Sequence, residues 1–131
     1  MRFNQDMITH HRQTIQLAEL AADRSSSSYV RGLSKKLIAG EEADIQVMST
    51  WLRSWQAPVP SEQDAKTGSE LRAGPGFDRR WLTVLSKQFD HGIQMAEVVR
   101  AAGRHGPTLQ LADRLITEQR AQLADITKQL A

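Results

Sequence analysis

The chain repeats its own hydrophobic pattern, and this internal repeat is the feature that most constrains its fold. A shift of 78 residues places residues 3–53 over residues 81–131 without a gap, and 9 of these 51 positions are identical. Most identities fall on apolar residues spaced three or four apart, which is the spacing of one face of an α-helix. Because a single helical hairpin cannot bury both of its faces, a duplicated hairpin predicts a core of four helices.

The apolar periodicity also predicts where the helices lie. We expect helices over residues 2–24, 28–56, 77–103 and 107–130. No segment alternates with the period of a β-strand over a useful length. Serines at 25–28 can cap the second helix, and Pro107 suits the first turn of the fourth helix. Pro58 and Pro60 end the second helix.

The segment between the hairpins, residues 57–76, is long enough to run the full length of a bundle. Twenty residues reach about 66 Å when extended, whereas a helix of 29 residues is about 44 Å long. This favours a ferritin-like bundle in up-down-down-up order, and an up-down-up-down order stays open. We therefore expect one all-α domain over residues 1–131, with repeat one at 1–56, a crossover at 57–76 and repeat two at 77–131.

Composition removes several classes of function. The chain has no cysteine, which excludes a disulfide framework, a thiolate zinc site, an iron–sulfur cluster and a cysteine nucleophile. Its net charge of +2 gives no strong field for nucleic acid, and no apolar run approaches the roughly 18 residues that span a bilayer. No phosphate-binding glycine loop, nucleophile elbow or His-Glu-x-x-His motif occurs, and we expect a protein that is not an enzyme.

Polar residues interrupt the apolar stripe of the first hairpin. Met7, His10 and His11 share one face of the first helix, and Glu41, Asp44 and Met48 share one face of the second. With the hairpin turn near residues 26–27, residues at the same level have numbers that sum to about 53. Two imidazoles, two carboxylates and two thioethers are therefore predicted to converge in the middle of the bundle.

Such a cluster has two physical explanations. Buried carboxylates are costly unless they are paired or bind a metal. Ion pairs between histidine and carboxylate are one solution. A metal ion is the other, with imidazole and carboxylate as ligands and methionine sulfur favouring Cu(I). The methionines have a further interpretation as packing residues, because methionine fills irregular bundle cores.

The second repeat lacks this cluster. Amide and apolar side chains stand at the equivalent positions, namely Leu85, Gln88, Phe89, Gln119 and Gln122. His91 lies one turn from Gln88, so this region predicts a hydrogen-bonding layer and a poor site for a divalent metal. A symmetric di-iron centre is therefore disfavoured.

The motifs of the two repeats carry a family resemblance. The first copy reads Phe3, Met7-Ile8-Thr9-His10-His11, Ile15-Gln16-Leu17-Ala18, Glu41-x-x-Asp44-Ile45 and Trp51-Leu52. The second copy reads Phe77-Asp78, Trp81-Leu82, Gln88-Phe89-Asp90-His91-Gly92-Ile93-Gln94-Met95-Ala96 and Gln119-x-x-Gln122-Leu123. Over nearly its whole length the chain resembles domain of unknown function 305, a bacterial family, and this resemblance implies a ferritin-like four-helix bundle.

The resemblance also implies a location and a ligand. Members of this family are usually exported, often in a periplasmic or lipid-anchored form, and some are associated with copper binding and tolerance through Met and His. In this sequence the implied metal ligands are Met7, His10, His11 and Met48. The sequence departs from the family where its second His-His pair is Gln88-Phe89.

We therefore expect an exported, non-enzymatic protein that binds a metal ion, with copper as the ion. The predicted ligands are Met7, His10 and His11, with Glu41, Asp44, Met48 and His91 as further candidates. We expect no nucleic-acid partner and no membrane span, and a homo-oligomer is compatible with the sequence. The alternative is a metal-free bundle that keeps the scaffold and acts through oligomer or partner contacts.

Overall fold

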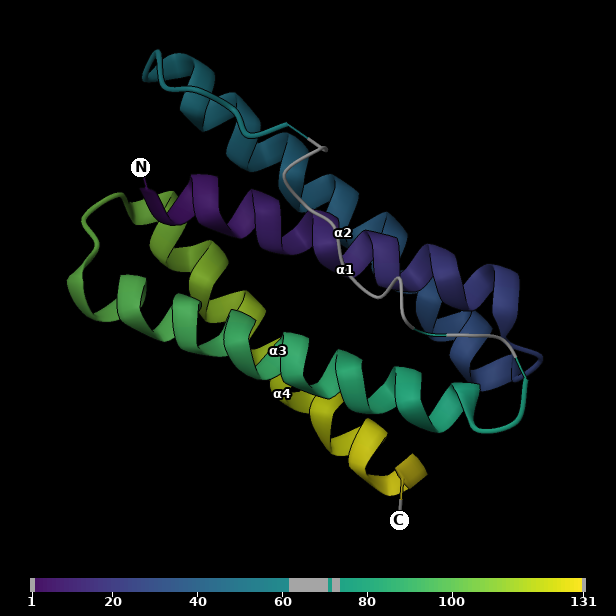
Figure 1. The fold of residues 1–131 in the computed structure, drawn as a ribbon. Coiled ribbons are helices and arrows are strands. Elements are labelled where there is room, and N and C mark those ends of the chain that lie inside the picture. Colours follow the sequence, from purple (N-terminus) through teal and green to yellow (C-terminus); the bar gives the residue numbers. More distant parts are fainter. Residues whose placement is uncertain (1, 62–70, 72–73, 131) are drawn as a thin grey trace.

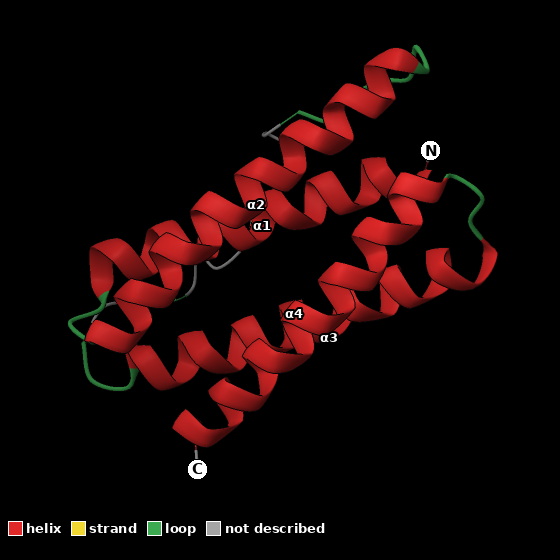
Figure 2. Cartoon of the chain, turned by 180° about the vertical axis from the view of Figure 1, so that it is seen from behind, coloured by secondary structure: helices red, strands yellow, loops and turns green. Residues whose placement is uncertain are grey.

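The computed structural model describes residues 2–61, 71 and 74–130, and all the regular secondary structure in these residues is helical (Figure 2). The four helices are α1 (Arg2–Arg24), α2 (Ser28–Ser54), α3 (Phe77–Ala102) and α4 (Gly106–Leu130). Each predicted boundary lies within two residues of the observed one. The all-α four-helix prediction is confirmed, whereas the comparison with ferritins stays a prediction.

Local signals explain where the helices begin and end. The side chain of Ser27 caps α2 by accepting a hydrogen bond of 3.3 Å from the backbone N–H of Val30. Gly76 precedes α3 with a φ of 81°, a left-handed conformation that glycine adopts without steric cost. The starts of α2 and α3 are therefore encoded locally, and the long apolar stripes decide how the helices pack.

The helices are ordered up, down, down, up. Figure 1 shows α1 and α2 as one antiparallel hairpin and α3 and α4 as another, with α2 and α3 running in the same direction. Helix α1 packs against both α2 and α3. The up-down-down-up order that the long connection predicted is confirmed. None of the described helices is sufficiently long and apolar to cross a bilayer.

The described parts of the connection between the hairpins follow α1 from its beginning to its end. Three α1 side chains each donate a hydrogen bond to a backbone carbonyl of this connection: Gln5 to Pro58, Arg12 to Pro60 and Arg24 to Leu71. The side chain of Leu71 is buried in the same apolar cluster as Phe77 and Trp81. The connection is therefore part of the packed structure at these points.

A buried polar layer lies between two of the three apolar clusters that the described residues form. One apolar cluster contains Leu17, Leu37 and Trp81, and the indole N–H of Trp81 donates to the Leu17 carbonyl at 2.7 Å. The other contains Met7 and Met48. Along α1, α2 and α4, the buried polar residues between these clusters are His10, His11, Thr14, Glu41, Asp44 and Gln119. The candidate site lies in this layer.

Candidate metal site

One imidazole and two carboxylates converge between α1 and α2. The Nε2 atom of His11 lies 2.6 Å from Glu41 Oε2 and 3.2 Å from Asp44 Oδ2. One candidate donor atom from each residue lies within 4.8 Å of the other two. All three side chains are buried, and His11 has no exposed surface at all. The structure thus brings these three predicted residues together.

The hairpin geometry explains this convergence. Glu41 and Asp44 are three residues apart, so they leave the same face of α2. His11 faces them because the short turn at residues 25–27 fixes the level at which α1 and α2 pair. The distances among these three residues are set within one hairpin, and the sequence therefore predicts their contact.

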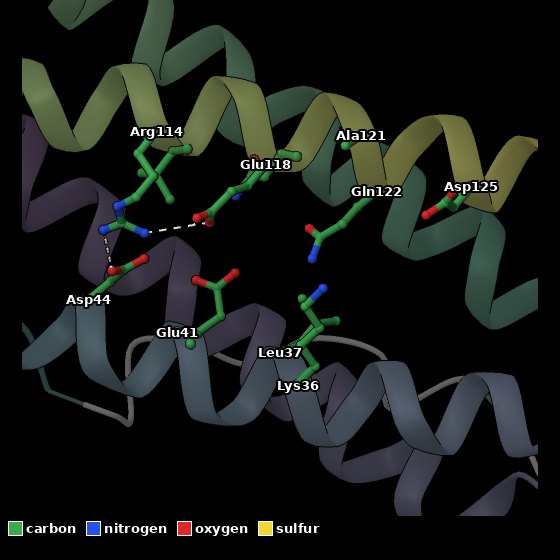
Figure 3. A pocket seen from close by; sticks show the side chains of 12 residues that line it. Lys36, Leu37, Glu41, Asp44, Arg114, Glu118, Ala121, Gln122 and Asp125 are labelled. Atoms are coloured by element: carbon green, nitrogen blue, oxygen red, sulfur yellow. Dashed lines mark hydrogen bonds and ion pairs between the residues drawn. The ribbon is translucent and has the colours of Figure 1, made fainter.

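A fourth charged group comes from α4 and was missed by the sequence analysis. Arg114 Nη2 lies 2.8 Å from Asp44 Oδ1, and its Nη1 lies 3.5 Å from Glu118 Oε2. Figure 3 shows Arg114 reaching across from α4 to Asp44 on α2. The only sequence signal is the spacing of Arg114 and Glu118 on one helix face, and this spacing does not reveal the contact with α2.

The carboxylates set the charge of His11. Burial alone disfavours the charged imidazole, but Glu41 and Asp44 outweigh it and raise the pKa of His11 to about 9. Burial would likewise raise the pKa of Asp44, but hydrogen bonds from His11 and Arg114 hold that pKa below its ordinary value. At neutral pH His11 is therefore protonated, and a metal ion that takes its Nε2 atom must displace a proton.

A polar groove leads to the two carboxylates. It lies between α2 and α4, has a volume of about 390 Å³ and includes Glu41 and Asp44 in its wall. Figure 3 shows both carboxylates directed toward α4, with Glu118 and Gln122 on the opposite side. The groove gives a small ion a route from solvent to Glu41 and Asp44.

His10 lies apart from this cluster and faces α3. Its ring forms an edge-to-face contact with His91, with ring centroids 5.2 Å apart. Burial, followed by the neighbouring His11 and His91, lowers the pKa of His10 to about 3, so the ring is neutral at physiological pH. The backbone of Gln88 lies close enough to raise the pKa of His10, but this effect is the weakest of the four. Neither ring nitrogen of His10 has a partner with hydrogen-bond geometry among the described residues.

The prediction that all six polar and thioether groups form one cluster is wrong. His10 and His11 are adjacent, so their side chains leave α1 about 100° apart. His11 turns toward α2, whereas His10 turns toward α3. Met7 and Met48 are fully buried in an apolar cluster with Ile8 and Leu52. Their role as ligands stays a prediction, as does that of His10 and His91.

The amides of the second hairpin form part of the predicted hydrogen-bonding layer. Gln88 Nε2 donates to the His10 carbonyl at 2.9 Å and to Thr14 Oγ1 at 3.2 Å. Gln119 is buried, and its Oε1 atom has no hydrogen-bond partner among the described residues. The second hairpin thus contributes amides to the middle of the bundle, where the first contributes charged groups.

The donor set of the cluster fits a divalent transition metal. Imidazole nitrogen and carboxylate oxygen suit Cu(II), Zn(II) and related ions, whereas thioether sulfur suits Cu(I). His11, Glu41 and Asp44 supply the first kind of donor and no sulfur. The residues are therefore suited to Cu(II) better than to Cu(I).

Comparisons with known proteins agree with the fold. Residues 1–130 match the family described as Domain of unknown function (DUF305). A comparison with curated proteins gives no significant match.

Solved structures of similar fold include CopM in two copper-bound forms. The Cu(I)-bound form is 24% identical, with a TM-score of 0.86 over 97% of this chain and 91% of that chain. The Cu(II)-bound form is 23% identical, with a TM-score of 0.87 over 98% and 93%. A DUF305 protein from Streptomyces coelicolor, for which secretion has been proposed, is 19% identical, with a TM-score of 0.88 over 98% and 89%. These likenesses establish the fold.

Proposed function

The chain belongs to the DUF305 family, and from that premise we propose that it is a copper-binding protein that holds Cu(II) on His11, Glu41 and Asp44. The observation that carries this proposal is the convergence of one buried imidazole and two buried carboxylates within 4.8 Å. Such a set is costly to bury without a partner for each charge. Cu(II) is also the divalent first-row ion that nitrogen and oxygen sites bind most tightly.

The surroundings of the three residues support a binding site. The groove between α2 and α4 admits an ion, and its wall carries the carboxylates of Glu118 and Asp125 as well. Bound copper would supply the positive charge that protonated His11 supplies in its absence. Arg114 stays beside Asp44 and limits how strongly a cation is held, because like charges repel.

Similar folds give independent support for copper as the ion. CopM has been solved in Cu(I)-bound, Cu(II)-bound and Ag-bound forms. That protein shares the arrangement of helices with this chain. The likeness supports a metal-binding role for the scaffold, and the ligands are proposed from the residues of this chain alone.

We propose binding, and not catalysis, as the activity of the bundle. A di-iron oxidase needs carboxylate and histidine ligands from both halves of a bundle. Here Phe89, Gln119 and Gln122 stand where the first hairpin has His11, Glu41 and Asp44. Assay of the copper-loaded protein for oxidase turnover tests this, and turnover that depends on Glu41 would contradict it.

We also propose that the protein is exported. The S. coelicolor relative, for which secretion has been proposed, supports this location. Fractionation of cells that express the natural gene, with an antibody against the bundle, provides the test. Recovery of the protein only from the cytoplasmic fraction would exclude export.

A calorimetric titration with Cu(II) tests the proposed site. Glu41→Gln removes a ligand with almost no change in shape, and Glu42→Gln is the matched control because Glu42 is the exposed neighbour on the same helix. Even outer-shell partners of metal ligands are worth about 10- to 100-fold in affinity. We therefore expect Glu41→Gln to weaken Cu(II) binding by at least about tenfold, and Glu42→Gln to leave it unchanged.

Two results would overturn the proposal. One is a wild-type protein that takes up no Cu(II), and the other is equal binding by the wild type and Glu41→Gln. Either result would leave the cluster as a network of structural ion pairs. The metal-free bundle that acts through oligomer or partner contacts would then be the better description.

A further inference from the structure

We propose a second metal site, for a soft monovalent ion such as Cu(I) or Ag(I), formed by His10, His91 and Met95 between α1 and α3. This site is separate from the proposed Cu(II) site, shares no ligand with it and has a different donor chemistry. The inference therefore stands or falls independently of the proposed function.

A cavity brings the three residues together. It has a volume of about 300 Å³, opens to solvent and is lined by Asp6, Thr9, His10, Gln13, His91 and Met95. His10 closes its inner side, because that residue is only 3% exposed. His91 is exposed and Met95 is half-buried, so the cavity connects a buried imidazole with the surface.

His10 is the observation that points to a ligand. Neither its Nδ1 nor its Nε2 atom has a hydrogen-bond partner among the described residues, although both atoms are buried. Buried polar atoms in native proteins are nearly always satisfied by protein, by water or by an ion. An imidazole whose ring nitrogens have no protein partner, beside an open cavity, can direct a nitrogen lone pair at a metal.

The partners of His10 are placed by α3. His91 and Met95 are four residues apart, so they leave the same face of that helix. The His91 ring already contacts the His10 ring, with centroids 5.2 Å apart. Gly92 makes this approach possible, because a Cβ atom there would lie only 2.9 Å from His10 Cε1.

The donor set decides which ion fits. Two imidazoles and one thioether are soft or borderline donors that suit Cu(I) and Ag(I). The proposed Cu(II) site, in contrast, has two carboxylates and no sulfur. His10 and His91 were among the ligands predicted from the sequence, whereas Met95 was not.

Titration with Ag(I) in chloride-free buffer tests this site, because Ag(I) is a soft ion that does not change oxidation state. Met95→Leu removes the sulfur at nearly constant volume, and His91→Gln removes an exposed imidazole. Met7→Leu and Met48→Leu remove sulfur from the apolar cluster and test the alternative that a soft ion binds there. Native mass spectrometry gives the number of bound ions and calorimetry gives the affinity.

We expect the wild type to bind Ag(I), and Met95→Leu and His91→Gln each to weaken that binding by at least about tenfold. Met7→Leu and Met48→Leu should bind as the wild type does. Glu41→Gln should retain Ag(I) binding even though it weakens Cu(II) binding. No Ag(I) uptake by the wild type, full uptake by Met95→Leu, or loss in Met7→Leu or Met48→Leu would overturn the assignment.

Discussion

The two hairpins share a backbone plan but differ in what they bury in the middle of the bundle. The first buries His11, Glu41 and Asp44, which form ion pairs. The second has Phe89 and Gln119 buried at equivalent positions. The apolar stripe that builds the bundle is common to both hairpins, so the fold does not require the charged cluster. The charges of the first hairpin therefore need a reason of their own, and metal binding provides one.

The largest change in stability is expected when His11 of the first hairpin is replaced by phenylalanine, the residue at the equivalent position of the second. His11→Phe leaves Glu41 and Asp44 buried without their main partner, and breaking a buried ion pair costs about 3–5 kcal/mol. We expect a loss of this size in the free energy of unfolding, measured with urea in the absence of metal. The triple variant His11→Phe, Glu41→Gln, Asp44→Gln carries the complete set of the second hairpin and should recover most of the loss. A triple variant that is no more stable than His11→Phe would show that the residues of the second hairpin cannot replace the charged residues of the first.

The pH dependence of stability should separate His10 from His11. The pKa of His11 is raised to about 9, so its contribution is complete below about 6.5, the ordinary pKa of histidine, and is lost as the pH rises through about 9. The pKa of His10 is lowered to about 3, so stability falls as the pH drops from about 6.5 toward 3. Each arm amounts to at most about 3–5 kcal/mol.

Urea unfolding of the metal-free protein between pH 4 and pH 9 measures both arms. In the triple variant of the first hairpin the alkaline arm should disappear, because phenylalanine replaces His11 and no group with a raised pKa remains at position 11. The acidic arm should become smaller in that variant, because the share due to the lowered pKa of Asp44 is lost, but the share due to His10 should persist. An alkaline arm of unchanged size would show that His11 does not cause it.

A smaller effect is expected where the second hairpin makes room for the first. Gly92→Ala places a Cβ atom 2.9 Å from His10 Cε1 and 2.8 Å from Gln119 Oε1, and overpacking of a core costs about 1–3 kcal/mol. Gly32→Ala is the matched control, because its Cβ would meet no atom within 4 Å. The control should gain about 0.5–1 kcal/mol from helix propensity, while Gly92→Ala should be less stable than the wild type in thermal or urea unfolding. Equal stabilisation of both variants would contradict the close packing of His10 against α3.

The smallest change in stability is expected at the contact between the hairpins. Arg114 is about half exposed, and such ion pairs contribute roughly 0.2–1 kcal/mol. Arg114→Gln should therefore change stability by less than about 1 kcal/mol, yet it should strengthen Cu(II) binding roughly three- to tenfold by removing a nearby positive charge. Arg120→Gln, which loses a surface pair with Glu97 at 3.5 Å, is the control. Weaker Cu(II) binding by Arg114→Gln would show that Arg114 helps to hold the site together instead of opposing the cation.

Whether a contact could be predicted from the sequence depends on whether it lies within one hairpin or between the two. The helix bounds, the Ser27 cap and the meeting of His11 with Glu41 and Asp44 all depend on one hairpin, where the turn fixes the register. These features could be predicted. The up-down-down-up order of the helices was favoured by the length of the connection, and Figure 1 confirms this order.

Contacts between the hairpins could not be derived in the same way. Arg114 meets Asp44 across α2 and α4, and His10 meets His91 across α1 and α3. The periodicity of one chain gives which face of a helix is apolar, but it does not give the rotation and height at which two hairpins pack. For that reason the contact of His10 with α3 and the contact of Arg114 with Asp44 could not be predicted from the sequence.

Pulsed electron paramagnetic resonance of the protein loaded with one equivalent of Cu(II) tests the central claim most directly, because it reports the imidazole nitrogens coupled to the metal. We expect coupling to an imidazole in the wild type, an unchanged spectrum for Glu42→Gln, and loss of that spectrum in the triple variant with the second hairpin's residues. An identical Cu(II) spectrum from the triple variant would show that the metal binds elsewhere and would contradict the assignment to the first hairpin.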